Sequence, residues 1–223
     1  MKDKIYVKNL TKVYGKNDNK TIALHDVTFN IDKNEFVAIC GSSGSGKTTL
    51  FNIISGIDRQ YEGDCFIDEV NIKTLKNDEL TTKRRKDIGI IYQFFNLISF
   101  LTVEENIKLS KELDGKKVDN KNLDFILKQL DLEKYKNSFI HELSGGQQQR
   151  VAIARVMLAD CDIILADEPT GNLDSHNTIK IMEIFKQMKS QGKTIVVITH
   201  DSYVANQADR IINLKDGEIV DEL

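Results

Sequence analysis

A glycine-rich segment in the first quarter of the chain has the residue types and spacing of a phosphate-binding loop. The pattern G-x-x-x-x-G-K-[S/T] is filled in order by Gly41, Ser42, Ser43, Gly44, Ser45, Gly46, Lys47 and Thr48. Glycines let the backbone turn tightly, so that successive N–H groups point into one concavity, which the next helix N-terminus completes. Lys47 would add a point charge for the β- and γ-phosphates. The segment therefore predicts a nucleoside triphosphate site, with Thr49 as the next residue of the binding set.

The alternative interpretation of this segment is a flexible linker rich in glycine and serine. Ordinary residue frequencies would place the four fixed positions by chance in about 1% of chains of this length. An apolar run at 36–40 precedes the loop and a helix-like stretch at 49–54 follows it, which lowers that chance further. The context favours a nucleotide site over a linker.

A second glycine motif lies about a hundred residues downstream. It is formed by Leu143, Ser144, Gly145, Gly146 and Gln147. Ser144 is typical of a helix N-cap, and apolar residues recur at helical spacing after it. The N-terminus of this helix would be a second anion site. A chain with two such helix ends must bring both to one nucleotide, or share two nucleotides with a second copy.

Together these motifs resemble those of the ATP-binding cassette (ABC) ATPases, and the resemblance covers almost the whole chain. In that family two cassettes dimerise head to tail, and each ATP lies between the phosphate loop of one chain and the signature motif of the other. The remaining family motifs follow in the expected order. They are the base-stacking aromatic Tyr14, the Q-loop residue Gln93, the Walker B strand with Asp167 and Glu168, the D-loop at 171–174 with Asp174, and the switch histidine His200.

The resemblance implies a Mg²⁺ site built from oxygen ligands. Thr48, Gln93 and Asp167 would hold the metal, and Gln93 would also sense the γ-phosphate. Asp167 follows a strand-like apolar run, which would place its carboxylate at the end of a buried strand. Hydroxyl, carbonyl and carboxylate oxygens are the ligands that Mg²⁺ prefers. ATP and Mg²⁺ are therefore the expected cofactors.

The resemblance also assigns the catalytic roles. Phosphoryl transfer to water depends on charge stabilisation and on a positioned water. Glu168 would polarise that water, and general-base assistance of this kind is typically worth about 10²–10⁴ in rate. His200 would hold the γ-phosphate and the water by hydrogen bonds, while Lys47 and the signature backbone would cover the developing charge. The chain is expected to be an active ATPase.

Each of these residues also has an ordinary structural interpretation. Asp167 and Glu168 alone could be two acids that end a strand, but the run Pro-Thr-Gly-Asn-Leu-Asp after them favours the catalytic interpretation. A lone histidine is usually a surface or core residue, and a β-branched run before His200 is what distinguishes it. Tyr14 could be a packed aromatic and Gln93 a loop residue, and only order and spacing favour their functional roles. The remaining histidines have no such support and are interpreted as ordinary: His25, His141 and His176.

The elements that must position these residues alternate between strand and helix patterns, which predicts an α/β fold. Strand patterns lie at 5–7, 23–29, 36–40, 88–92, 163–167, 194–199, 210–215 and 218–220. Helical patterns lie at 47–55, 103–113, 120–130, 145–159, 175–190 and 201–206. The resemblance implies a P-loop NTPase (RecA-like) core sheet with an N-terminal antiparallel β subdomain. Residues 94–142, which have no convincing strand, would form a helical signature subdomain inserted into a core of 1–93 and 143–223, so that 1–223 make one cassette.

The composition favours an intracellular protein and gives no footprint of nucleic-acid binding. The 223 residues carry a formal net charge of −3, and the basic cluster at 83–86 has acidic neighbours, which is typical of a solvated helix end. Three cysteines, Cys40, Cys65 and Cys161, lack metal-ligand spacing and are expected to be reduced thiols of a cytosolic protein. The residues at 1–4 do not have the pattern of a signal peptide.

A run of apolar residues follows directly after Gln93. It consists of Phe94, Phe95, Leu97, Ile98, Phe100 and Leu101. No stretch of the chain reaches the roughly 18–20 apolar residues that a membrane-spanning helix needs. In ABC transporters the coupling helix of a membrane subunit docks at this place, whereas the alternative is that the run only fills the helical subdomain. We expect part of 93–101 to contact a separate permease, with the chain at the cytoplasmic face of the membrane.

The residues within the motifs indicate a group of ABC cassettes, but they do not indicate which substrate is transported. Residues 143–151 and 165–174 resemble cassettes of the macrolide-exporter, lipoprotein-release and antimicrobial-peptide-exporter group and the related cell-division cassette. The leading hypothesis is a homodimeric ATPase that drives export, or transmits force, through its permease. One alternative is a non-transport ABC ATPase on DNA or ribosomes, which the lack of a long coiled coil and of a second cassette disfavours. The other is a regulatory cassette of the cell-division type, which has the same motifs.

Overall fold

The computed structural model describes residues 3–15 and 19–222, and at its centre lies a six-stranded sheet in the order β10-β9-β3-β8-β7-β6. Its strands are β3 (Phe36–Cys40), β6 (Ile88–Ile91), β7 (Ile163–Asp167), β8 (Thr194–Thr199), β9 (Arg210–Lys215) and β10 (Glu218–Glu222). All of them are parallel except β10, which pairs antiparallel with β9. The carboxyl ends of β3, β6, β7 and β8 therefore lie along one edge, where ligands bind in open α/β sheets.

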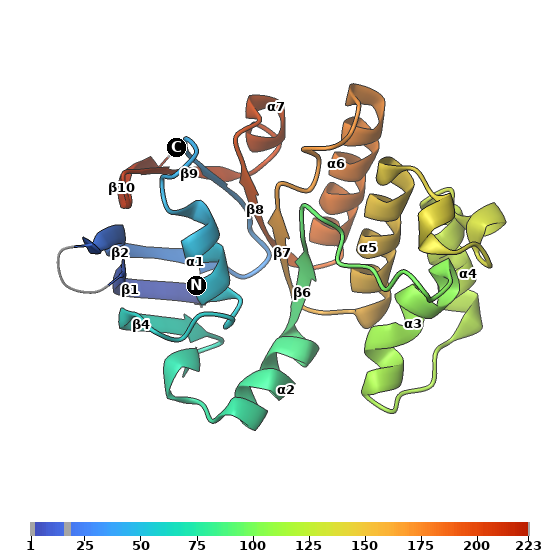
Figure 1. Cartoon of the computed structure of the whole chain (residues 1–223), viewed down its shortest axis with the longest axis horizontal. Helices are drawn as coiled ribbons and strands as arrows, with labels where there is room; N and C mark the ends of the chain where they lie inside the picture. Colours follow the sequence, from blue (N-terminus) through green and yellow to red (C-terminus); the bar gives the residue numbers. More distant parts are fainter. Residues whose placement is uncertain (1–2, 16–18, 223) are drawn as a thin grey trace.

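A four-stranded antiparallel sheet lies beside the central sheet, in the order β2-β1-β4-β5 (Figure 1). Its strands are β1 (Asp3–Tyr14), β2 (Thr21–Asp32), β4 (Glu62–Ile67) and β5 (Val70–Asn71), and the short helix η2 (Ile72–Thr74) follows β5. Helix α1 (Lys47–Ile54) contacts β2 of this sheet and β7 and β8 of the central one. The start of α1 is thereby placed between the two sheets.

Side chains of the central strands point alternately into two hydrophobic cores. In β3, Phe36 packs in the core with the helices that follow the signature motif, whereas Val37 and Ile39 pack in the core with the antiparallel sheet and α1. In β8, Ile195 and Val196 divide between the two cores in the same way. Because both faces are covered, these strands read as continuous apolar runs.

The other face of the central sheet is covered by helices. The long helices are α5 (Gly145–Ala159) and α6 (Ser175–Ser190), and α7 (Ser202–Ala205) follows β8. Helices α3 (Val103–Leu113) and α4 (Asn120–Gln129) pack against α5 (Figure 1). The segment 94–142, all of which the structure describes, adds only the short helices η3 (Glu133–Tyr135) and η4 (Ile140–Glu142) and one isolated bridge.

The predicted α/β fold with an antiparallel β subdomain is confirmed, and several elements differ from the sequence prediction. The strand predicted at 5–7 runs over Asp3–Tyr14, because irregularities in its pairing interrupt the apolar alternation. Strands β4 and β5 and helix α2 (Asn77–Asp87) were not predicted as elements. Helix α2 buries only Leu80, so it has no apolar stripe to detect, although the basic cluster at 83–86 does form its last turn. Residues 1, 2, 16–18 and 223 of the predicted cassette lie outside the described residues.

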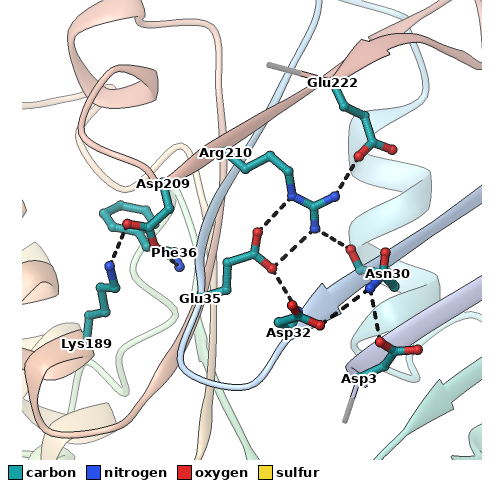
Figure 2. A network of polar contacts seen from close by, with 9 residues as sticks. All are labelled: Asp3, Asn30, Asp32, Glu35, Phe36, Lys189, Asp209, Arg210 and Glu222. Carbon is teal, nitrogen blue, oxygen red and sulfur yellow. Dashed lines mark hydrogen bonds and ion pairs between the residues drawn. The ribbon is translucent and has the colours of Figure 1, made fainter. Parts of the chain in front are cut away.

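A network of polar contacts ties the two sheets together at the amino ends of β3 and β9 (Figure 2). Arg210 donates from Nε to Oε1 of Glu35 at 2.7 Å and from Nη1 to Oε2 of Glu222 at 2.6 Å. It also donates to the carbonyl oxygen of Asn30 on β2. Beside it, Asp209 accepts the first backbone N–H of β3 at 2.8 Å. These contacts hold β2 against the central sheet.

Candidate nucleotide-binding site

The glycine-rich loop connects the carboxyl end of β3 to the first residue of α1. Gly46 is the N-cap of α1 with a φ of 104°, and a Cβ there would lie 2.4 Å from the carbonyl oxygen of Ala23. Gly44 has a φ of 81°, and a Cβ there would meet no described atom within 4 Å. Glycine at 46 thus permits close contact with β2. Because no side chain caps α1, its first N–H groups are available to a ligand.

Lys47 lies across the loop that it follows. Its Nζ donates to the carbonyl oxygens of Gly41 at 2.8 Å and Ser42 at 2.7 Å. The buried Oγ of Ser45 has no hydrogen-bond partner among the described residues. Ser45 is 2% exposed and does not line the nucleotide cavity, whereas Lys47 does.

Glu168 and His200 meet at the carboxyl ends of β7 and β8. Oε1 of Glu168 lies 2.7 Å from Nδ1 of His200, and Thr199 donates from Oγ1 to Oε2 of Glu168 at 3.4 Å. The backbone N–H of Glu168 donates to the carbonyl oxygen of Ile198 at 2.9 Å. Glu168 has a φ of 44°, a left-handed conformation that is uncommon outside glycine and tends to occur at functional sites. Its carboxylate is thus aimed at His200 by a constrained backbone.

Asp167 lies in an environment that disfavours its charge. Burial raises the pKa of the Asp167 carboxyl, the nearby Glu168 charge raises it further, and Lys47 acts in the opposite direction. Burial and the Glu168 charge also raise the pKa of the Cys40 thiol at the start of the loop. A divalent cation beside Asp167 would offset the repulsion between the two carboxylates.

These groups surround one open cavity of about 620 Å³, a volume typical of small-molecule sites. It is lined by Thr21, Ile22, Ala23, Ser43, Gly44, Gly46, Lys47, Thr48, Thr49, Gln93, Asp167, Glu168 and His200. The structure therefore brings together the three predicted Mg²⁺ ligands, Thr48, Gln93 and Asp167. It also places the predicted catalytic residues on the same cavity.

No cluster of three or more acidic, histidine or cysteine side chains suited to a metal occurs in the described ranges 3–15 and 19–222. In the Mg²⁺ sites of phosphoryl-transfer enzymes one or two carboxylates act together with phosphate oxygens and water. The donor set Thr48, Gln93 and Asp167 fits a metal that arrives with the triphosphate.

One wall of the cavity comes from β2 and was missed by the motif analysis. It is formed by Thr21, Ile22 and Ala23, and the side chain of Ile22 is 57% exposed. No motif marks these residues, because they reach the site through the pairing of β1 with β2 and through the close contact of Gly46 with Ala23. An exposed isoleucine in a strand is too common to have identified the wall from sequence.

Tyr14 lies at the rim of the cavity and is not part of its lining. It ends β1, and its side chain is 43% exposed. Its hydroxyl lies 3.5 Å from Oγ1 of Thr49, which does line the cavity. The predicted base-stacking aromatic is therefore placed next to the first turn of α1.

The second glycine motif opens on a different surface. Ser144 caps α5, since its Oγ accepts from the N–H of Gln147 at 3.4 Å and its own N–H donates to Oε1 of Gln147 at 2.7 Å. Residues 143–147 contribute nothing to the cavity lining. A Cβ at Gly146 would meet side chains of Leu173 and Asn177. The signature helix start therefore lies beside the D-loop.

Asp174 joins the D-loop to the signature helix through Asn177. Its carboxylate accepts from the backbone N–H and from Nδ2 of Asn177, both at 2.8 Å, and these bonds lower the pKa of Asp174. Oδ1 of Asn177 accepts from Nη1 of Arg150 on α5 at 2.8 Å. The sequence analysis did not predict this link.

The apolar run after Gln93 divides into a packed part and an exposed part. Leu97 packs against the core of the helical segment, and the buried Asn106 accepts the N–H of Ile98 at 2.8 Å and donates to its carbonyl oxygen at 3.0 Å. Phe94 and Phe100 are 79% and 76% exposed. Two of the six apolar residues thus present large side chains to solvent.

Comparison with known proteins gives one family. The family model described as ABC transporter matches residues 24–171. The chain is 46% identical over 220 residues to the macrolide export ATP-binding/permease protein MacB of Campylobacter jejuni. It is also 46% identical over 223 residues to the uncharacterized ABC transporter ATP-binding protein MJ0796 of Methanocaldococcus jannaschii, covering 96% of this chain and 94% of that protein. The match to MacB covers 98% of this chain and 34% of MacB, so this chain spans about a third of the length of such relatives.

Solved structures give the same result. The dimeric structure of a post-hydrolysis state of the MJ0796 cassette, bound to ADP and Pi, has a TM-score of 0.92 at 44% identity, covering 98% of this chain and 97% of that one. The structure of cbiO1 from Clostridium perfringens, part of an ABC transporter complex, has a TM-score of 0.85 at 29% identity, covering 100% and 88%. The likeness extends over both sheets and the helical segment.

Proposed function

Because this chain belongs to the ABC transporter family of ATP-binding cassettes, we propose that it hydrolyses Mg-ATP as a dimer and drives a separate membrane permease. The cargo would be peptide, lipoprotein or drug related, moved by export or through force transmission. The observation that carries the proposal is the single cavity that unites the phosphate loop with Asp167, Glu168 and His200. The signature helix, which the same chemistry needs, lies outside it.

The cavity supports binding of ATP with Mg²⁺. The free N–H groups at the start of α1 and the Lys47 ammonium suit the oxygens of a triphosphate. Thr48, Gln93 and Asp167 would hold Mg²⁺, which when bound neutralises charge on the phosphates. The base would lie toward Ile22 of the β2 wall, next to Tyr14.

Hydrolysis would be the task of Glu168 and His200. Glu168 would accept a proton from the attacking water, and its bond to His200 keeps the carboxylate directed to the cavity. Lys47 can turn from the carbonyl oxygens of its own loop to phosphate oxygens, since a lysine carries flexible donors. The remaining negative charge would be covered from outside the chain, by the signature helix of a second copy.

The head-to-tail dimer follows from the separation of the two glycine motifs. Ser144 and its helix open on a surface distinct from the cavity, so each site would be completed by the partner. The relative MJ0796 has a dimeric structure bound to ADP and Pi. One chain with both halves can form two equal sites in a symmetric pair.

The surface around Phe94 and Phe100 is the proposed contact with the permease. Both side chains are largely exposed and follow Gln93 of the nucleotide cavity along the chain, and exposed apolar groups beside a site suit contact with a partner. The relative MacB is named as an ATP-binding/permease protein. We place the chain at the cytoplasmic face of the membrane through this contact.

Among the described residues no helix combines the length and apolarity required to cross a bilayer.

Mixing two inactive variants tests the shared site. Lys47→Ala removes the loop cation and Ser144→Arg fills the signature helix start, so each should abolish ATPase activity alone. In a 1:1 mixture half of the dimers contain one copy of each variant, and each mixed dimer has one intact site of its two. About a quarter of all sites are then intact, so about a quarter of wild-type turnover should be restored. Phosphate release would be measured against total protein.

The controls are the same variants at doubled concentration without mixing. If the mixture stays as inactive as its parts, the composite site is wrong. Turnover of the wild-type chain that is strictly proportional to concentration far below dimer formation would also contradict it.

A further inference from the structure

Lys12 on β1 is a buried cation that no motif explains. Only 5% of its side chain is exposed. Its Nζ lies 2.7 Å from Oδ2 of Asp58 and donates to the carbonyl oxygen of Gln60 at 2.6 Å. A buried charge is costly unless it is paired and hydrogen-bonded, and both conditions hold here.

The same ammonium covers one face of the Tyr14 ring. Lys12 Nζ lies 4.7 Å from the ring centroid, within the range of a cation–π interaction. The Tyr14 hydroxyl lies 3.4 Å from Oδ2 of Asp58, the oxygen that also pairs with Lys12, and 3.5 Å from Oγ1 of Thr49. The ring is thus held by its back face and by its hydroxyl.

The charge of Asp58 is secured by the same contacts. Burial on its own would raise the pKa of Asp58, but hydrogen bonds from Lys12 and from the backbone N–H of Gln60 outweigh it and hold the pKa below its usual value. Asp58 therefore stays ionised at neutral pH and keeps Lys12 in place. The two residues and Tyr14 form one unit at the cavity rim.

We propose that Lys12 is a positioning residue for nucleotide binding: paired with Asp58, it fixes the Tyr14 ring from behind and leaves a single face for the base. The inference rests on the proposed function, and it adds residues to the site that the family motifs do not include. A ring with one covered face and 43% of its side chain exposed presents a defined surface beside Thr49 and the cavity. Without Lys12 the Tyr14 ring could rotate. Stacking of the base would then have to order the ring, and this loss of conformational entropy would lower the affinity.

A purely structural role is the competing explanation, because Lys12 also links β1 to residues 58–60. The two roles differ in which part of the nucleotide they affect. A structural defect would weaken binding of every ligand at the phosphate loop. A positioning defect would weaken only the contribution of the base. Base stacking on an aromatic ring lowers the Kd by about 5- to 150-fold.

The experiment compares ATP with inorganic tripolyphosphate, which lacks the base and ribose, both with Mg²⁺ in calorimetric titrations. Lys12→Met keeps an unbranched stem and removes the charge. It should weaken ATP binding by about 3- to 30-fold, the range of a partly desolvated cation–π contact, and change tripolyphosphate binding by less than about twofold. Lys12→Arg retains a cation and should recover most of the ATP affinity. Lys8→Met, at an exposed position of the same strand, is the matched control.

The double variant Lys12→Met/Asp58→Asn avoids an unpaired buried carboxylate, in case the single variant folds poorly. It should show the same selective loss. Equal weakening of both ligands in the folded double variant, or full ATP affinity in it, overturns the positioning role. A wild-type chain that binds neither ligand instead overturns the nucleotide site itself, and the inference falls with it.

Discussion

The two glycine-led helix starts of this chain are built differently. At α1, Gly46 is a left-handed N-cap with no side-chain hydrogen bond, and the cation that follows it rests on carbonyl oxygens of the loop. At α5, Ser144 and Gln147 close the first turn reciprocally in a capping box. A helix leaves about four N–H groups unpaired at its start. At α1 these groups are free for a ligand, whereas at α5 the side chains already satisfy part of them.

This difference indicates how the work is divided. The α1 end shares its cavity with Asp167, Glu168 and His200, so the proposed phosphate binding and water activation would occur in one place. The first turn of α5, with its capping box, contains no acidic residue, and Asn177 lies between it and the D-loop. The first should therefore determine nucleotide affinity in a single chain, and the second should act only when a partner presents its nucleotide. The predictions below test that division.

The largest effect is expected from Glu168→Gln, which removes the base but keeps the shape of the side chain. Turnover should fall by about 10²–10⁴-fold, while ATP binding remains and an ATP-bound dimer accumulates. Single-turnover phosphate release and size-exclusion chromatography would measure the two effects. Glu183→Gln, at an exposed position of α6, is the control. Wild-type turnover of Glu168→Gln would show that the α1 cavity does not contain the base.

A second test compares the two helix starts by their effect on ATP affinity at low protein concentration. Lys47→Ala removes a charged hydrogen-bond donor worth about 1.5–3 kcal/mol, and should raise the Kd by about 10- to 150-fold. Ser144→Arg should leave the Kd of the single chain within about twofold, although it stops turnover. Equilibrium titration would measure both, with Lys128→Ala on the exposed side of α4 as control. Equal losses in the two variants would mean that the division between helix starts is wrong.

The sequence predicted the acid and histidine side of the cavity well, and the reason is geometric. Gln93 and His200 follow parallel strands of the central sheet, Asp167 is the last residue of another, and parallel strands end at the same edge. A short motif at the end of an apolar run is therefore enough to predict that a side chain lies at this edge of the sheet, even when the rest of the fold is not known. The roles of these residues remain predictions that the variants above address.

On the base side of the cavity the sequence predicted only Tyr14, because pairings between distant segments build the rest. Ile22 reaches the site because β2 pairs with β1, and it lies just before the part of β2 that was predicted as a strand, 23–29. Lys12 looks like any strand lysine until Asp58, on the segment after α1, is placed beside it. Local patterns determine which residues follow a strand, and tertiary contacts determine which strand forms the opposite wall.

The smallest expected effect is on stability, and it distinguishes Asp167, the proposed Mg²⁺ ligand, from the other residues of the α1 site. The raised pKa of Asp167, caused by burial and then by Glu168, means that the folded chain binds this proton more tightly than the unfolded chain. The associated stabilisation is complete below the ordinary value of 3.8 and is lost as the pH rises through the raised value, so at neutral pH the ionised carboxylate is a cost.

Asp167→Asn should therefore stabilise the ligand-free chain by about 0.5–2 kcal/mol at neutral pH, and the gain should shrink as the pH is lowered toward the raised pKa of the wild-type carboxyl. Thermal unfolding in a pH series would measure the gain, and the same variant should lose the dependence of ATP affinity on Mg²⁺. Asp216→Asn, in the exposed turn after β9, is the control for a generic loss of negative charge. A gain that is equal at every pH would mean that the ionisation of Asp167 is not its source. A loss of stability would mean that the Asp167 carboxylate makes a favourable contact in the ligand-free chain. Its charge would then not be a destabilising feature that a bound metal relieves.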